Sequence, residues 1–527
     1  MTTTSHHTRT RGALAGLVAA ALLLGTATAA AAVVGRGSDP FLAVGDTVVR
    51  LSPPVLTSFA IETFGSYDKL VLFVGIGVVL ALVAAGSGVL ATRRLALGLV
   101  APVGLVLAAG AAVLAAPATT VTDLLPLLVG TAVGATAFVL LVRLAAGRRR
   151  GAPVRADDAD GTTAADGTGA RPPASRRLFL GLVGAGAAAS AGLVAAGQVL
   201  GRTLRDATAS RDGLALPPAS NSLDDVPTGA ELVEGAPFRT PNADFYRVDT
   251  ALTVPQESAE DWVVRVHGLV DRPLELDWAA LTTRFEVVDR EITLVCVSNP
   301  VGGELAGNAV WRGIRLADVL AEAGVDPRAD MVLSTSVDGW TASTPLEALV
   351  DTDDPLLAFA MNGEPLPFEH GFPVRMVVPG LYGYVSATKW VTDLKVTTFA
   401  EDEAYWTPRG YAAEAPVKIA SRIELPASFA QLDAGPVVVA GTAWHPGVGI
   451  DTVEVRVDDG DWQPAELGEV PGPTTWRQWR FEWDAEPGQH TLRVRATDAE
   501  GEVQTDERAE IAPDGSSGWH SVVVTVT

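Results

Sequence analysis

Long apolar runs fill the first 200 residues of this 527-residue chain, whereas later segments mix short apolar runs with polar positions. Five of the early runs are nearly free of charge and about as long as a helix that crosses a bilayer. These runs are 13–34, 70–90, 95–116, 124–145 and 178–200. The pattern predicts a membrane region over residues 1–200 with five transmembrane helices.

Arginines flank these apolar runs on one side only, if the runs cross the membrane in alternating directions. The arginines are Arg9 and Arg11, Arg93 and Arg94, Arg148 to Arg150, and Arg176 and Arg177. Because cytoplasmic loops are enriched in Arg and Lys, we expect this side to be cytoplasmic. The chain is then a multi-pass protein of the cell membrane, and everything after about residue 200 is extracytoplasmic.

Two of the runs also resemble export signals. The first ends in Thr26-Ala-Thr-Ala-Ala30, which resembles a cleavage site, so the run is either a retained helix or a removed leader. The fifth begins with Ser175-Arg-Arg-Leu-Phe-Leu-Gly181, which is either a twin-arginine-like signal or an ordinary positively charged anchor. The stretch 147–175, rich in Gly, Ala, Asp and Thr, predicts a flexible cytoplasmic linker.

Beyond residue 200 the pattern changes twice. Short β-rich runs such as 262–266 and 331–334 alternate with helical patterns such as 316–323, which predicts an α+β domain over 201–404. From 405 to 527 only strand patterns separated by turn residues remain, which predicts an all-β, immunoglobulin-like sandwich. The expected fold is therefore multidomain, with α-helical membrane segments followed by these two domains.

Composition and charge add two limits. Hydrophobic residues make up 48% of the chain, which agrees with several membrane segments. The formal net charge of −23 repels phosphate backbones, which argues against nucleic acid as a partner.

Cys296 is the only cysteine, and it stands where the apolar strand pattern 292–296 runs into a loop with Gly302 and Gly303. Without a second cysteine the chain cannot form an intramolecular disulfide. The thiol is therefore a small buried hydrophobe, a nucleophile or a thiolate ligand of a metal. Residue type alone favours the first interpretation.

The segments around Cys296 resemble the sulfite oxidase family of molybdopterin enzymes, from about residue 230 to the C-terminus. The resemblance rests on three ordered motifs: Thr240-Pro-Asn-Ala-Asp-Phe-Tyr-Arg-Val-Asp-Thr250, the Cys296 loop with 307–320, and the stretch 370–390. It implies a molybdenum–molybdopterin cofactor in an oxidoreductase domain over 201–404, with the Cys296 thiolate bound to the metal. The domain over 405–527 is similar to the family's dimerisation domain, which leaves a homodimer open.

The same resemblance assigns roles in the first motif, called here the 240–250 segment. Asn242, Phe245 and Tyr246 would contact the pterin, and Arg247 would face the metal pocket. Asp338 occupies the place where the family often has an acidic cofactor contact.

The stretch 370–390 contributes the largest group of expected cofactor contacts. A pterin phosphate needs hydrogen-bond donors and positive charge, and Gly380 and Gly383 permit the loop to fold back so that donors converge. Taken alone, a histidine and an arginine at this spacing are more often a surface pair. The expected contacts are His370, Arg375, Ser386, Thr388 and Lys389.

The segment Trp406-Thr-Pro-Arg-Gly-Tyr411 resembles the part of the family that carries an active-site tyrosine. Tyr411 is therefore expected to donate a proton, and Arg409 to contact an anion. The implied reaction is two-electron oxygen-atom transfer on a small anionic or sulfur-containing substrate, such as sulfite or a sulfoxide.

Histidine and methionine, the usual haem ligands, are absent from all five apolar runs, so no haem is expected there. Electrons would then pass to a separate carrier, and the membrane region would be an anchor or a docking surface. The alternative is a non-enzymatic, membrane-tethered binding module on a molybdopterin-domain scaffold. Cys296, His370, Arg375 and Lys389 together favour the enzyme.

Overall fold

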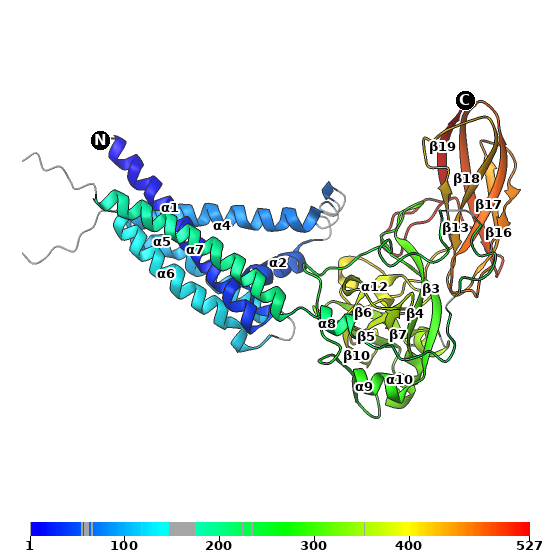
Figure 1. Ribbon diagram of the computed structural model, residues 1–527, viewed down its shortest axis with the longest axis horizontal. Coiled ribbons are helices and arrows are strands. Elements are labelled where there is room, and N and C mark those ends of the chain that lie inside the picture. The colour runs from blue at the N-terminus through cyan, green and yellow to red at the C-terminus, as the bar shows by residue number, and fades with distance from the viewer. Residues whose placement is uncertain are drawn as a thin grey trace, which may run out of the picture. The chain divides into compact units, whose positions relative to one another are not determined.

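The computed structural model describes residues 2–53, 56, 59, 63–64, 67–116, 119–146, 174–223, 225–232, 235–352 and 354–527. The linker predicted over 147–175, with Arg148 to Arg150, lies outside these residues except for its last two positions. The chain divides into two compact units, Met1–Asp206 and Ala207–Thr527. Figure 1 labels the elements of each.

The first unit is helical. Its helices are α1 (Thr2–Val34), α2 (Pro40–Leu51), α4 (Asp68–Arg93), α5 (Leu95–Leu114), α6 (Leu125–Ala145) and α7 (Ala174–Leu204), with short 3-10 turns η1 (Arg36–Ser38) and η3 (Val121–Leu124). Five helices in the described part of the chain are long and apolar enough to cross a membrane: His7–Val34, Lys69–Arg93, Leu95–Leu114, Val121–Ala145 and Arg177–Asp212. Helices at all five predicted positions are confirmed, and their crossing of a membrane stays a prediction.

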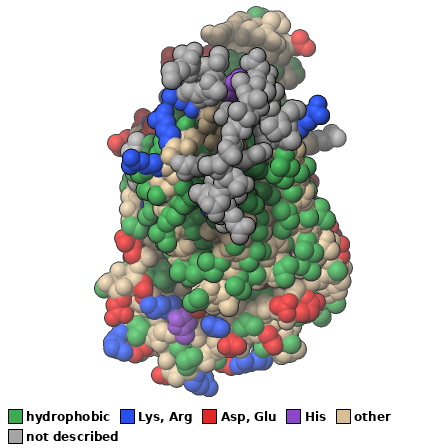
Figure 2. All heavy atoms as spheres, turned by 90° about the vertical axis from the view of Figure 1, so that its left-hand side faces the viewer, with side chains coloured by type: hydrophobic (Ala, Val, Ile, Leu, Met, Phe, Trp, Pro, Cys, Tyr) green, Lys and Arg blue, Asp and Glu red, His purple; other side chains and the backbone are tan. Residues whose placement is uncertain are grey.

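Small residues let α1 pack closely on its neighbours. A Cβ added to Gly16 of α1 would collide with the backbone of Ala84 in α4, and one added to Gly130 of α6 would lie 2.6 Å from the Leu23 carbonyl oxygen. Such backbone contact through glycine and alanine is typical of helices in lipid. Large apolar side chains on α4 and α5 stay exposed, among them Leu82 and Leu107, and Figure 2 shows hydrophobic side chains gathered on the face that it presents.

The second unit begins with an α+β region built on two sheets. One sheet has the order β2-β1-β10-β5-β6, and the other has the order β3-β4-β7-β8 with β9 paired to β7. The strands are β1 (Val263–Gly268), β2 (Leu274–Asp277), β3 (Val287–Val295), β4 (Ala306–Arg315), β5 (Met331–Ser336), β6 (Thr341–Pro345), β7 (Leu356–Met361), β8 (Glu364–Pro365), β9 (Arg375–Val377) and β10 (Val391–Thr397). The helices are α8 (Thr208–Asp212), α9 (Trp278–Arg284), α10 (Leu316–Ala323), α11 (Glu347–Val350) and α12 (Gly383–Ser386), with 3-10 turns η4 (Phe368–His370) and η5 (Thr407–Arg409).

Apolar side chains from both sheets share one core. Val264 of β1 and Leu394 of β10 pack in the same buried cluster as Ile314 of β4 and Phe359 of β7. Helix α10 adds Leu320 to this cluster, and the helix ends at Gly324, whose φ of 72° reverses the chain at little cost. This part of the chain therefore combines sheets with short helices, and the predicted domain bounds 201–404 stay a prediction.

The rest of the second unit contains two mainly antiparallel sheets that face each other. One has the order β11-β13-β17-β16 and the other β12-β19-β18-β14-β15, with β12 running parallel to β19. The strands are β11 (Ala420–Leu425), β12 (Gln431–Leu432), β13 (Gly435–Trp444), β14 (Ile450–Val457), β15 (Gln463–Pro464), β16 (Glu466–Leu467), β17 (Arg477–Ala485), β18 (Gly488–Asp498) and β19 (His520–Val526). Val439 and Trp479 from the first sheet pack with Val453, Leu492 and Val524 from the second, so the predicted strand-rich C-terminal region is confirmed.

Candidate active site around Cys296

Cys296 directly follows β3 and opens a loop that is tied at both ends. The Cys296 N–H donates to the Leu305 carbonyl at 2.9 Å, and the Asn299 N–H donates to the Cys296 carbonyl at 3.0 Å. The side chain is 9% exposed, and burial raises the pKa of its thiol, while Ser298 and the charge of Lys389 act in the opposite direction. A bound metal cation would hold such a buried thiol in its thiolate form.

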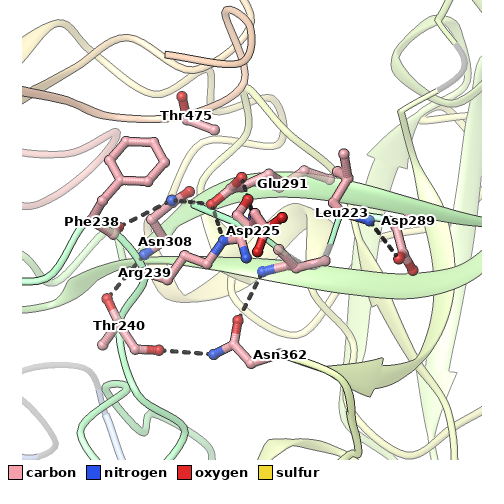
Figure 3. A network of polar contacts seen from close by, with 12 residues as sticks. Leu223, Asp225, Phe238, Arg239, Thr240, Asp289, Glu291, Asn308, Asn362 and Thr475 are labelled. Atoms are coloured by element: carbon pink, nitrogen blue, oxygen red, sulfur yellow. Dashed lines mark hydrogen bonds and ion pairs between the residues drawn. The ribbon is translucent and has the colours of Figure 1, made fainter. Parts of the chain in front are cut away.

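Polar side chains on β3 fix the strand that carries Cys296. Asp289 accepts two hydrogen bonds from Arg312, at 2.7 and 2.9 Å, and Glu291 accepts two from Arg239, at 2.8 and 3.1 Å. Thr293 donates to the side-chain oxygen of Asn308 at 3.1 Å. Figure 3 shows the Glu291–Arg239 pair, and it shows Asp289 with the Leu223 N–H that donates to it at 3.2 Å. Both carboxylates are buried and paired, so β3 presents Cys296 from a strand whose polar face is satisfied.

Side chains of the strand-rich C-terminal region also hold the Cys296 loop. Arg422 donates to the Gly303 carbonyl at 2.8 Å, and Ser516 donates to the Asn299 carbonyl at 2.7 Å. Gly302 has a φ of 79°, and a Cβ there would collide with the His520 ring. The loop is therefore enclosed by residues more than a hundred positions away in the sequence.

Three tyrosines lie within electrostatic reach of the thiol. A charged Cys296 would raise the pKa of Tyr246, Tyr382 and Tyr411, although burial is the larger cause in each case. Burial raises the pKa of Tyr382 to about 12. All three phenols therefore stay protonated near neutral pH and can donate a hydrogen bond. Tyr382 was not among the predicted site residues, and its position between Gly380 and Gly383 was the available signal.

The 240–250 segment contributes an aromatic surface. The ring centroid of Phe245 lies 5.2 Å from the ring centroid of Tyr246, 5.7 Å from that of Trp311 and 5.6 Å from that of His370. Gly307 is required beneath this group, because a Cβ there would lie 2.7 Å from the Phe245 ring. The ring of Tyr411 forms a second aromatic group with Tyr384 at 5.5 Å and with Trp406 at 5.2 Å.

Arg375 provides a buried positive charge. Its side chain donates to the carbonyls of His370 at 3.1 Å, Met376 at 3.3 Å and Ala387 at 3.4 Å, and its Cζ lies 5.0 Å from the Trp311 ring centroid. The residue is 5% exposed, and burial lowers its pKa to about 10. No carboxylate among the described residues forms an ion pair with Arg375. A buried cation of this kind fits an anion such as a phosphate, which would supply the missing charge.

His370 and Lys389 lie beside Arg375. His370 is 3% exposed, and burial together with the charges of Arg375 and Lys389 lowers its pKa to about 4, so the ring is neutral at pH 7. Its Nε2 lies 3.2 Å from the Asn242 carbonyl oxygen. Lys389 donates to Asp249 at 2.8 Å and to the Glu369 carbonyl at 2.9 Å, and burial lowers its pKa to about 8. The alternative of a surface pair for His370 and Arg375 is wrong, because both side chains are buried.

The remaining predicted site residues have hydrogen-bond, ion-pair or ring partners within the protein. Ser386 donates to the carbonyls of Leu381 and Tyr382 within its own turn, and Thr388 shares a 2.6 Å hydrogen bond with Ser334. Further partners are the Trp340 N–H for Asp338, the Tyr405 carbonyl and ring for Arg409, Asp249 for Arg247, and the Met361 carbonyl for Asn242. Gly380 has the positive φ expected of a reversing loop, at 80°, whereas Gly383 begins α12.

Comparisons with known proteins identify the same region. The family model described as "Oxidoreductase molybdopterin binding domain" matches residues 251–406. Mitochondrial sulfite oxidase of Mus musculus is 35% identical over 351 residues, covering 56% of this chain and 62% of that protein. Nitrate reductase 1 (NADH) of rice, Oryza sativa subsp. japonica, is 35% identical over 194 residues, covering 32% and 21%.

A bacterial relative is covered more completely. The uncharacterized oxidoreductase YuiH of Bacillus subtilis is 36% identical over 155 residues, which cover 29% of this chain and 74% of YuiH. By contrast, the matches to the mouse, rat and human sulfite oxidases span only 46–62% of those proteins. With the Cys296 site, these similarities show that the chain belongs to the sulfite oxidase family of molybdopterin-dependent oxidoreductases.

Proposed function

We propose that this protein is a membrane-anchored, extracytoplasmic molybdenum oxidoreductase that transfers an oxygen atom to or from a small substrate. The observation that supports this most directly is the grouping of one buried thiol, Cys296, with two buried cations, Arg375 and Lys389. A molybdenum–molybdopterin cofactor bound there would supply two-electron redox chemistry.

In this proposal each residue has a defined task. Cys296 provides the thiolate ligand of the metal, and the pterin provides the other soft ligands. Asn242, Phe245 and Tyr246 contact the pterin. The phosphate is held by Arg375, Lys389 and the neutral ring of His370 as a hydrogen-bond donor, with Ser386, Thr388 and Asp338 as further contacts of the cofactor.

The substrate side is proposed to lie near Tyr411. Its protonated phenol would donate a hydrogen bond or a proton to a departing oxygen, and Arg247 and Arg409 would attract an anion. Relatives named sulfite oxidase and nitrate reductase support an oxyanion as substrate. Sulfite is the first candidate and a sulfoxide the second.

The architecture proposed for the whole chain has three domains. A membrane region over 1–200 anchors the protein, the molybdopterin domain occupies 201–404, and an immunoglobulin-like sandwich over 405–527 is available for dimerisation. Electrons would pass to a separate carrier rather than to a haem in the helices, because the apolar runs lack histidine and methionine.

Turnover of the purified full-length chain in detergent tests this proposal. We expect sulfite-dependent reduction of an artificial electron acceptor without any second protein, and no haem absorption band. If the substrate is a sulfoxide, we expect the protein to reduce it with electrons from a reduced dye. Absence of both activities from a chain that contains molybdenum would contradict the proposed substrates, and absence of the metal would favour the non-enzymatic alternative.

A further inference from the structure

Asn362 has a backbone conformation that few residue types adopt. It follows β7 with a φ of 51° and is one of four non-glycine residues with positive φ in the described part of the chain. Asparagine tolerates this left-handed region better than most residues, but glycine adopts it at less cost. The presence of asparagine rather than glycine therefore suggests that the side chain has a role.

The Asn362 side chain joins three segments. Its Nδ2 donates to the Thr240 carbonyl oxygen and to the Asn242 side-chain oxygen, both at 2.9 Å. Its Oδ1 accepts from the Val310 N–H at 3.0 Å, and its own N–H donates to the Val310 carbonyl at 2.7 Å. The turn after β7 is thereby tied to β4 and to the 240–250 segment.

Asn308 of β4 holds the preceding residues in a similar way. Its Nδ2 donates to the Phe238 carbonyl and to Glu291, both at 3.2 Å. Its main chain forms two hydrogen bonds with Thr240. The Thr240 N–H donates to the Asn308 carbonyl at 2.8 Å, and the Thr240 hydroxyl accepts from the Asn308 N–H at 3.2 Å. Figure 3 shows Asn308 and Asn362 both reaching Thr240.

The contact with Asn242 leads directly to the proposed cofactor site. The Asn242 carbonyl lies 3.2 Å from His370 Nε2, and the Phe245 and Tyr246 rings follow within the same short segment. Among the described contacts, Asn362 has none with the residues proposed to hold the phosphate. Its influence on the site would therefore pass through Asn242.

We propose that Asn362 is a positioning residue for the pterin: its carboxamide fixes Thr240 and Asn242, and so sets where the 240–250 segment meets the cofactor. The proposal rests on the proposed function, because it assumes that this segment contacts the pterin.

Two variants distinguish the effect of the Asn362 side chain from the effect of its backbone conformation. Asn362→Gly removes all three side-chain hydrogen bonds and relieves the positive φ, and Asn362→Asp keeps an acceptor for Val310 but loses both donated bonds. Asn221→Gly is the matched control. The Asn221 side chain also forms two hydrogen bonds with the main chain of one residue. Its Nδ2 donates to the Asp289 carbonyl at 3.1 Å, and its Oδ1 accepts from the Asp289 N–H at 2.9 Å. It has no described contact with the 240–250 segment.

Two measurements on the full-length chain report on the segment. The first is hydrogen exchange of the Thr240, Asp244 and Phe245 amides, which are hydrogen-bonded in the structure, on protein prepared without cofactor. The second is the rate of molybdopterin loss after dilution of the loaded protein. Both Asn362 variants should show at least about tenfold faster exchange and at least about tenfold faster loss, the effect of removing the two neutral hydrogen bonds that both variants lose. Asn221→Gly should change neither rate.

The outcomes separate the two proposals. Wild-type protein that binds no molybdopterin would overturn the proposed function and this inference with it. Wild-type protein that binds the cofactor, with Asn362 variants that release it no faster, would overturn the positioning role alone. Equal acceleration in Asn221→Gly would also overturn it, because the effect would then reflect general loosening of the fold.

Discussion

The Lys389 ammonium lies 2.8 Å from the Asp249 carboxylate, and the two side chains are only 10% and 5% exposed. The same carboxylate oxygen accepts from Arg247 at 3.0 Å, whose side chain is 44% exposed. Asp249 therefore links a buried cation beside Cys296 to a partly exposed one. This arrangement keeps Lys389 charged although burial lowers its pKa to about 8.

Replacing Asp249 by Asn should lower the Lys389 pKa further, because the Asp249 charge opposes the effect of burial. Lys389 would then lose its charge at a lower pH, by at least about one unit. We expect molybdopterin loss to accelerate at a correspondingly lower pH than in the wild type. Asp244→Asn, which changes an exposed carboxylate of the same segment, is the control. Identical pH profiles for Asp249→Asn and the wild type would contradict the assignment.

His370 should make the cofactor-free fold sensitive to acid. Its pKa is about 4 when folded and about 6.5 when unfolded, so only the unfolded chain takes up the proton between these values. The free energy of unfolding should therefore fall with pH from about 6.5 to about 4, by up to ~3 kcal/mol from this residue. Denaturant unfolding followed by tryptophan fluorescence reports on the second unit, because all 12 tryptophans lie between Trp262 and Trp519. In His370→Asn the decline should be smaller by that amount.

Gly302→Ala should be more destabilising than its backbone conformation alone explains. A Cβ at Gly302 would collide with His520, whereas Gly363, with a similar φ of 82°, has open space around its Cα. Gly363→Ala should then cost about 1 kcal/mol from backbone strain, and Gly302→Ala about 1–3 kcal/mol more from overpacking. Adding His520→Ala should restore part of the loss in Gly302→Ala. No restoration would argue against the contact between His520 and the Cys296 loop.

Periodicity and motif order were enough to predict the helices, the two regions of strands and the cysteine at the end of a strand. The family resemblance and the residue types led to the expectation that His370 and Arg375 contact an anion, and only their burial excluded the alternative of a surface pair. The helices, the strand regions and the position of the cysteine could be predicted because they depend on neighbours within a few positions along the chain, whereas the anion-binding role of His370 and Arg375 stays a prediction.

Contacts between distant segments could not be predicted in this way. Arg239 and Glu291 are 52 residues apart, and Arg422 is 119 residues from Gly303. Neither pair leaves a local pattern, because each partner alone looks like a charged residue on a strand or loop. Asn362 was missed for the same reason: its neighbour Gly363 predicts a turn, but nothing nearby indicates Asn242 as its partner.

The topology prediction places the C-terminus outside the cytoplasm. Alkaline phosphatase fused after Thr527 should be active, because the enzyme requires an extracytoplasmic location, and the arginines flanking the five helices favour this orientation. A fusion at the same position that works only with a cytoplasm-specific reporter would reverse the assignment.

Molybdenum content of the purified full-length chain tests the central claim most directly. We predict one molybdenum per chain in the wild type, and a folded Cys296→Ser variant that keeps the pterin but has no turnover, because a hydroxyl is a poor substitute for a soft thiolate ligand. Wild-type protein without molybdenum, or a Cys296→Ser variant with undiminished turnover, would contradict the claim.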